Sequence, residues 1–407
     1  MSKESKWTKL EGRGVTAVPG FKTSGIASGM KNGKKDLAVI YSETDTSAAG
    51  VFTRNLVQAA PVHLCRSHLE NPIRVLVVNS KNANACTGKQ GERDAAEMAE
   101  KVASGLKINA GQALVCSTGV IGQPLPMNKV RTGIEKALAV LSRGAQVDQD
   151  TAEAILTTDT RVKQTAYRCT LPEGDFYLAG VAKGSGMICP NMATMLAFLT
   201  TDVNIERSLL QELFEEVVNK SFNAITVDGD TSTNDTALIL ANGAAKGVEI
   251  TKDSASYEQF KSLLEQVCQE LAYKIVEDGE GVTKVITLTI KGAADEEGAR
   301  VMARSVLNSP LVKTAFYGED ANWGRILVAL GYAGIDFDPN RVDIQIGPYQ
   351  VAVDGGSVPF SELEMKKVLK NRDQDLLIDL KQGSVEVTAW GTDLSHEYIS
   401  INSDYRS

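Results

Sequence analysis

Histidine is scarce in this 407-residue sequence, which contains only His63, His68 and His396. The spacing between His63 and His68 does not place the two side chains on one face of a helix. A histidine-based catalytic triad and a histidine-rich metal site are therefore disfavoured, and we interpret the three residues as solvated or capping groups.

Positive charge and aromatic residues are also in short supply. Lys and Arg number 43 against 51 Asp and Glu, which gives a net charge of -8, and aromatic residues make up 6%. A nucleic-acid partner is not expected, because phosphate neutralisation needs a basic patch. No run approaches the roughly 18 apolar residues of a membrane span. The polar start MSKESKWTKLEGRG lacks the apolar region of a secretory signal. We expect small-molecule chemistry away from membranes.

The cysteines form no C-x-x-C pair and are scattered along the chain, as Cys65, Cys86, Cys116, Cys169, Cys189 and Cys268. In a chain of this length they are typical of reduced thiols in a cytoplasmic protein, not of a disulfide framework or a zinc site. Neither a Walker-type phosphate loop nor a strand-linked G-x-G-x-x-G is present, so no nucleotide-type cofactor is expected.

The segment DGDTSTND, residues 228–235, begins like a calcium-binding loop. Thr233 stands where such a loop needs glycine, and Ile239 stands where it needs a bidentate glutamate, so an EF-hand is disfavoured. Two interpretations stay open: a turn of self-capping side chains, or a structural element beside an active site.

The hydrophobic pattern predicts a mixed α/β protein with helices packed on sheets. Predicted helices cover 91–108 and 256–279. The hydrophobic content of 43% suffices for one large core or two ordinary ones. Predicted strands cover 36–42, 74–80, 113–118, 237–242, 284–292, 325–334 and 384–392.

The segment AKGSGMICPNMATMLAFLTTD, residues 182–202, places Thr194 between a turn-rich stretch and an apolar run. A hydroxyl nucleophile without histidine needs another base, and the α-amine of an N-terminal threonine is one solution. Such an amine has a pKa of about 7.7–8.0, so a useful fraction is neutral near pH 7. It would exist here only after cleavage of the bond between Ala193 and Thr194. The alternative for this stretch alone is a helix N-cap.

Several segments, taken in order, resemble the ornithine acetyltransferase family, the bifunctional glutamate N-acetyltransferases of arginine biosynthesis. The resemblance covers essentially the whole chain, and KGSGMICPNMATMLAF resembles the family's processing site. The other matching segments are SKNANACTG (80–88), CSTGVIG (116–122), TTDT (157–160), DGDTSTND (228–235), EDGEGVTK (277–284) and YGEDANWGR (317–325).

The resemblance implies roles for particular residues. Thr194 matches the nucleophile and the new N-terminus made by self-cleavage after Ala193, which would give an α chain of 1–193 and a β chain of 194–407. Thr118 and Gly119 match the oxyanion hole. The positions that match the family's substrate-binding residues are Thr157, Lys183, Thr194, Glu280, Asn402 and Ser407.

The resemblance also implies the reaction and the architecture. An acetyl group would pass from N-acetylornithine to Thr194, releasing ornithine, and then to glutamate, giving N-acetylglutamate. Acetyl-CoA is an expected second donor. The implied fold is an αββα sandwich of two stacked sheets flanked by helices, with the two pieces remaining associated as an α2β2 heterotetramer. No cofactor and no metal are implied.

Alternatives remain at this stage. Lys183 could be a solvated surface lysine, and Glu280 an ordinary carboxylate at a helix end. We expect Asn82, Asn84 and Asn322 to be architectural. The whole chain could instead be a self-processed amidohydrolase or aminopeptidase, a monofunctional ornithine acetyltransferase that does not use acetyl-CoA, or a non-enzymatic α/β binding protein.

Self-cleavage predicts that freshly purified protein is two chains under denaturing conditions. Intact-mass measurement should give pieces ending at Ala193 and beginning at Thr194, because cleavage of this bond gives Thr194 a free α-amine. A single full-length species in active protein would exclude self-processing.

Overall fold

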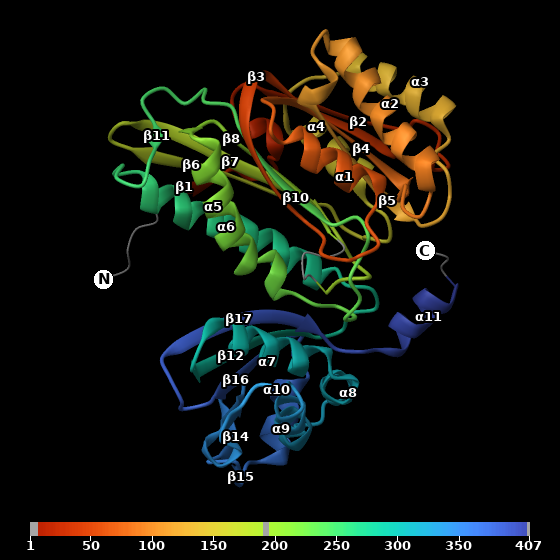
Figure 1. The fold of residues 1–407 in the computed structure, drawn as a ribbon. Coiled ribbons are helices and arrows are strands. Elements are labelled where there is room, and N and C mark those ends of the chain that lie inside the picture. Colours follow the sequence, from red (N-terminus) through yellow and green to blue (C-terminus); the bar gives the residue numbers. More distant parts are fainter. Residues whose placement is uncertain (1–6, 190–194, 405–407) are drawn as a thin grey trace.

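The computed structural model describes residues 7–189 and 195–404 and contains two bodies, a large sandwich and a smaller C-terminal unit (Figure 1). Ala193 and Thr194, the predicted cleavage residues, lie outside the described residues, as does Ser407. The division into pieces 1–193 and 194–407 therefore stays a prediction.

The first sheet of the sandwich contains strands from both sides of the predicted cleavage position. β7 and β8 are antiparallel neighbours, while β8 and β10 are parallel neighbours. The order of its strands is β1 (Trp7–Lys9), β6 (Lys163–Leu171), β7 (Gly174–Lys183), β8 (Leu196–Thr201), β10 (Thr236–Ala241) and the second half of β3 (Leu37–Phe52).

The second sheet continues from the first through the long strand β3. The first half of β3 pairs with β2 (Phe21–Ile26) and β4 (Ile73–Asn82), and β4 pairs in parallel with β5 (Ala113–Val120). The pairing of β3 with β4 is irregular between Tyr41 and Thr46. At this irregularity the strand passes from one sheet to the other.

Side chains that alternate along the strands build three apolar layers. Leu76 and Val78 of β4 share one cluster with Phe198 of β8 and Leu238 of β10, so this cluster is the core between the sheets. The outer face of the first sheet packs against α5 (Arg207–Asn219) and α6 (Tyr257–Glu277). The outer face of the second sheet packs against α2 (Gly88–Leu106) and α3 (Met127–Ala139). The predicted αββα sandwich is confirmed.

Shorter elements complete the sandwich. α4 (Ala145–Ile155) contributes Ala152 and Ile155 to the core between the sheets. The remaining elements are α1 (Ala60–His68), β9 (Asn204–Ile205), β11 (Glu249–Ile250) and the 3-10 helices η1 (Val15–Ala17), η2 (Ala110–Gln112) and η3 (Phe222–Ala224).

The C-terminal unit has its own six-stranded sheet and its own apolar cluster. Its strand order is β15 (Gly356–Ser357), β14 (Tyr349–Val353), β13 (Asp343–Ile346), β16 (Asp373–Asp379), β12 (Val285–Ala293) and β17 (Val385–Thr392). The accompanying helices are α7 (Glu296–Asn308), α8 (Pro310–Tyr317), α9 (Trp323–Gly331), η4 (Pro339–Arg341) and α10 (Glu362–Leu369). From β17 the chain runs to α11 (His396–Asp404), which lies apart from the small sheet (Figure 1).

Among the predicted strands, the one at 325–334 is wrong. This stretch belongs to α9, whose first turn is capped by the Asn322 side chain accepting the N–H of Arg325. Ile326, Ala329 and Leu330 are spaced on one helical face and are buried in the core of the C-terminal unit. The other predicted strands and both predicted helices are confirmed with small shifts of their ends, except that the strand predicted at 36–42 continues to Phe52 as β3. No helix in the described ranges is long and apolar enough to cross a membrane.

Glu270 anchors α6 to the edge of the first sheet. Its carboxylate accepts hydrogen bonds from Lys9 of β1 at 2.8 Å and from the Tyr167 hydroxyl of β6 at 2.7 Å, and Lys274 lies at 2.7 Å. Burial alone would raise the pKa of this carboxyl, but the hydrogen bonds from Lys274, Lys9 and Tyr167 outweigh burial and lower its pKa to about 2.

Glu270→Gln should therefore remove stability that depends on pH. A depressed carboxyl pKa stabilises the folded state above the unfolded-state value of about 4.3, and this stabilisation is lost as the pH falls towards 2. Denaturant unfolding should show a stability gap between wild type and variant that is widest near pH 7 and narrows below about pH 5. Glu258→Gln, which alters an exposed carboxylate of the same helix, is the control. A gap that does not change with pH would contradict this account.

Candidate active site

One cavity collects the described residues that the sequence predicted for the site. Its empty space, including the open mouth, is about 610 Å³. The predicted residues that line it are Thr118, Gly119, Thr157, Lys183, Glu280 and Asn402. They come from β5, the loop after α4, the end of β7, the loop after α6, and α11. Thr194 and Ser407 lie outside the described residues, so their positions relative to the cavity are not given by the structure.

The backbone at Gly119 requires glycine. Its φ is +129°, and Lys81, which faces it on β4, has a φ of +99°. A Cβ on Gly119 would lie 2.2 Å from the carbonyl carbon of Lys81. The two strands therefore approach closely beside Thr118, and the main chain of β5 is exposed to the cavity at this point.

Thr157 is held by the buried carboxylate of Asp159. The Thr157 N–H donates to Asp159 at 2.9 Å and its hydroxyl donates at 3.4 Å. Burial alone would raise the pKa of Asp159, but the nearby Lys183 and Lys163 outweigh it and hold this pKa well below its usual range. Asp159 is therefore an anion that fixes the Thr157 loop.

Lys183 is a buried cation at the end of β7, not a solvated surface lysine. Burial lowers the pKa of its ammonium group, and Asp159 and Glu280 oppose this effect. Within residues 7–189 and 195–404, no hydrogen bond or ion pair within 4 Å is found for this ammonium group. It is available for an anionic group that enters the cavity.

Glu280 supplies the opposite charge in the same cavity. Its N–H donates to the carbonyl of Ser185 at 2.9 Å, and its carboxylate accepts from the side chain of Asn402 at 2.9 Å. The carboxylate also packs on Gly186, where an added Cβ would lie 2.3 Å from one oxygen. A cavity that holds both Lys183 and Glu280 suits a ligand with a carboxylate and an amino group.

The segment DGDTSTND lies beside the cavity, which supports the second of its two sequence interpretations. Asp228 accepts the N–H groups of Met187 at 2.6 Å and Ile188 at 2.8 Å. Asn234 donates to the carbonyls of Ala83 at 2.6 Å and Ser117 at 2.8 Å. Three residues of this segment, Ser232, Thr233 and Asn234, also line the cavity. Their motif marked the segment in the sequence, but the three residues were not predicted individually.

Other polar residues of the matching segments are architectural, as expected. Asn84 donates to the carbonyl of Gly91 at 2.9 Å, and Asn82 donates to that of Pro124 at 3.3 Å. Cys116 and Cys189 are buried, and burial raises the pKa of the Cys116 thiol well above its usual value. No cluster of three or more metal-ligating side chains occurs in the described part of the chain.

Together, the fold and the cavity define an αββα protein with a small, charged amino-acid-sized site at the ends of its strands. The model of the ArgJ family matches residues 22–407. The chain belongs to the ArgJ family.

Two relatives match this chain over almost the full length of both sequences. The arginine biosynthesis bifunctional protein ArgJ of Symbiobacterium thermophilum is 50% identical over 398 residues, covering 97% of this chain and 98% of the relative. The protein of the same name from Caldanaerobacter subterraneus subsp. tengcongensis is 47% identical, with 98% and 99% covered. The crystal structure of the Bacillus halodurans ArgJ protein is 42% identical with a TM-score of 0.51, covering 52% of this chain and 100% of the solved chain.

The close approach at Gly119 predicts a position-specific loss of stability. Gly119→Ala would combine an unfavourable backbone angle with a clash against the main chain of Lys81, whereas Gly122→Ala adds a Cβ with nothing within 4 Å at a φ of +79°. The control variant should lose about 1–2 kcal/mol. Gly119→Ala should lose clearly more in denaturant unfolding, and equal losses would show that the backbone angle alone requires glycine.

Proposed function

We propose that the chain is an acetyltransferase of arginine biosynthesis that moves an acetyl group from N-acetylornithine to glutamate. The observation that carries this proposal is the cavity in which Lys183 and Glu280 lie together with Thr118 and Gly119. The family membership and the shared name of the relatives support it.

The charges of the cavity match the two amino-acid substrates. Both carry an α-carboxylate, which the buried ammonium of Lys183 would bind. Glu280, oriented by Asn402, would receive an amino group or assist its proton transfer. The hydroxyl of Thr157 is a further polar contact for the substrate. Ser407 is proposed as a substrate contact from its match to the family alone.

The reaction would proceed in two transfers through one covalent intermediate. The Thr194 hydroxyl attacks the acetyl carbonyl of N-acetylornithine while its own α-amine accepts the proton. The tetrahedral oxyanion is stabilised by Thr118 and the N–H of Gly119, and loss of one such donor typically costs about 10²–10³ in rate. Collapse breaks the amide bond, and the departing amine takes the proton, releasing ornithine. The amine of glutamate then attacks the acetyl ester, which frees the Thr194 hydroxyl and N-acetylglutamate.

Acetyl-CoA is proposed as a second acetyl donor, which would form the same acetyl-threonine and release the free thiol. The word bifunctional in the names of the relatives supports this choice over a monofunctional enzyme. Glutamate acetylation with acetyl-CoA as sole donor tests it. Release of acetate from N-acetylornithine regardless of glutamate would instead favour the hydrolase alternative.

Self-cleavage, an α2β2 assembly and a cytoplasmic location complete the proposal. The part of this chain after Ala193 makes up slightly more than half of its length. The solved Bacillus halodurans chain has a similar size, because 52% of this chain matches all of it. That share supports a division near the middle.

Thr194→Ala should give a single uncut chain without acetyl transfer, because it removes the nucleophile of both reactions. Denaturing electrophoresis reports the cut, and production of N-acetylglutamate from N-acetylornithine reports the transfer. Thr201→Val, which alters a buried threonine hydroxyl of β8 bonded to the Tyr177 carbonyl, is the control and should be cut. Cleavage or transfer by Thr194→Ala would overturn the assignment.

A further inference from the structure

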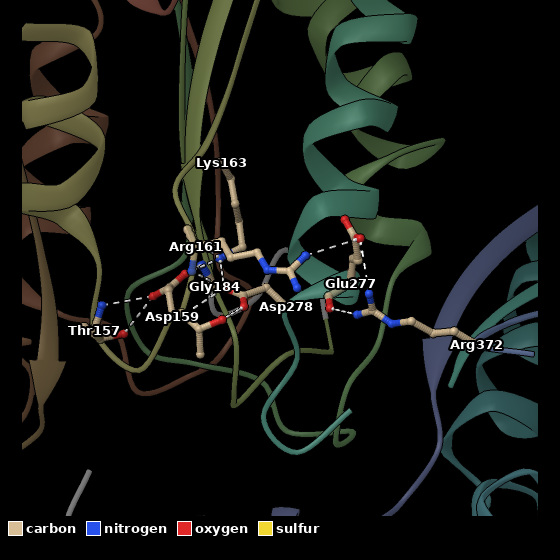
Figure 2. Close-up of polar contacts among 9 residues, drawn as sticks. Thr157, Asp159, Arg161, Lys163, Gly184, Glu277, Asp278 and Arg372 are labelled. Atoms are coloured by element: carbon tan, nitrogen blue, oxygen red, sulfur yellow. Dashed lines mark hydrogen bonds and ion pairs between the residues drawn. The ribbon is translucent and has the colours of Figure 1, made fainter. Parts of the chain in front are cut away.

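A buried ion cluster links the segment of residues 159–163 to Asp278, 115 residues away from Lys163 in the sequence (Figure 2). Its members are Asp159, Lys163 and Asp278. The Lys163 ammonium lies 2.7 Å from a carboxylate oxygen of Asp159 and 2.6 Å from one of Asp278. The Lys163 side chain is 1% exposed, that of Asp159 is 0% exposed and that of Asp278 is 5% exposed. Buried charges interact strongly because water does not screen them, so this geometry is tightly constrained.

The Asp159 end of the cluster holds one wall of the cavity. The same carboxylate that accepts the N–H and hydroxyl of Thr157 also accepts the N–H of Gly184 at 2.7 Å. Gly184 directly follows Lys183. One anion therefore positions both the Thr157 loop and the end of β7.

The Asp278 end holds the part of the wall that carries Glu280. Asp278 ends α6 and lies two residues before Glu280. Its carboxylate accepts the N–H groups of Thr160 at 3.0 Å and Arg161 at 3.2 Å, and also the Thr160 hydroxyl. The end of α6 is thus fastened to the loop that carries Thr157.

The surrounding exposed contacts are weaker. Glu277 pairs with Arg161 at 3.6 Å and with Arg372 at 3.4 Å, as Figure 2 shows. Arg161 is 64% exposed and Arg372 38% exposed, so solvent screens both pairs. The buried cluster, not this outer pair of contacts, carries the positioning.

We propose that Lys163 is a positioning residue for the acetyl-transfer site. By joining Asp159 to Asp278, Lys163 holds Thr157 and Glu280 at a fixed separation in the cavity wall. The proposal rests on the proposed function, because it assigns a part in that same site to a residue that does not line the cavity. Loss of Lys163 leaves two buried carboxylates without their shared cation, so their repulsion displaces both parts of the wall while Asp278 keeps its bonds to Thr160 and Arg161.

The charge of Lys163 provides a readout that a purely structural role would not give. The charged groups around the Lys183 ammonium are Asp159, Lys163, Asp235, Glu280 and Lys31. Burial lowers the pKa of Lys183, Asp159 opposes this, and Lys163 adds to the lowering. Removing the Lys163 charge should raise the pKa of Lys183, and the basic limb of kcat/KM should move to higher pH.

The test compares Lys163→Met with Lys163→Arg in the complete, cleaved protein. Lys163→Met should lower kcat/KM for N-acetylornithine by about 10- to 100-fold, mainly through KM, because the substrate contacts are displaced. Its basic limb should move to higher pH. Lys163→Arg keeps the charge, so its basic limb should stay in place and part of the activity should return.

Lys381→Met is the chemically matched control. Lys381 also bridges two aspartates, at 2.6 Å from Asp343 and 2.8 Å from Asp354, but it lies in the C-terminal unit and does not line the cavity. Its kinetics and pH profile should equal those of the wild type. Melting temperature and intact mass, measured for every variant, report folding and cleavage.

A milder variant keeps the proposal testable if Lys163→Met does not fold. Lys163→Gln removes the charge but keeps a polar side chain at this buried position, and should raise KM and move the basic limb to higher pH as in Lys163→Met. Wild-type KM and pH profile in a folded Lys163→Met, or in Lys163→Gln when Lys163→Met is unfolded, would overturn the proposal. Absence of acetyl transfer by the wild-type protein would instead overturn the proposed function.

Discussion

The stacking of two sheets whose faces are all covered is the constraint on which the rest of the structure depends. Inside the sandwich, polar side chains would lose water without gaining partners, so chemistry is confined to the strand ends. The register brings these ends together, because Lys183 at the end of β7 pairs with Leu196 at the start of β8, which pairs with Thr236 at the start of β10. The end of β5, with Thr118 and Gly119, lines the same cavity from the second sheet. The apolar core therefore determines where the site lies.

Charge at this edge is nearly balanced before any ligand enters. Lys183 is buried without a direct ion pair among the described residues, and Glu280 has only the amide of Asn402 as a side-chain partner there. Burying both charges away from water costs desolvation free energy. A ligand with a carboxylate and an amino group compensates this cost for both charges. A ligand with one charge relieves only one of them. The proposed binding of amino acids would be selective through this pair of charges, without a large apolar surface.

Local patterns predicted some of the strongly apolar or regularly spaced elements, but not the buried strand β8 or the amphipathic helix α5. The long face of Phe260, Leu264 and Leu271 indicated α6, and the β-branched run of β4 indicated a strand. The prediction for 325–334 was wrong because a short, mostly apolar run fits a buried strand as well as a short helix. The N-cap at Asn322, which identifies the helix, lies before this stretch. The short strands β13 and β14 gave too little pattern to predict.

The site was only partly accessible to sequence reasoning. The family resemblance named six of the described residues that line the cavity, because its short motifs contain them. It did not name Lys163 or Asp278, whose contact joins positions 115 residues apart and leaves no periodic signal. In the sequence, Lys163 is an ordinary polar residue at the start of a strand. In the structure, its 1% exposure distinguishes it from a solvated surface lysine.

The C-terminal unit belongs to the site although its sheet is separate. Lys313 of α8 donates to the carbonyls of Val227 at 2.8 Å and Thr392 at 2.5 Å, which joins the small sheet to the segment that starts at Asp228. Asp228 in turn accepts the hydroxyl of Tyr398 at 3.3 Å. This last contact holds α11 beside the cavity, where Asn402 of the helix donates to Glu280. These contacts connect the two bodies through a buried ammonium group and carbonyls, and they place α11 of the C-terminal part of the chain beside the cavity.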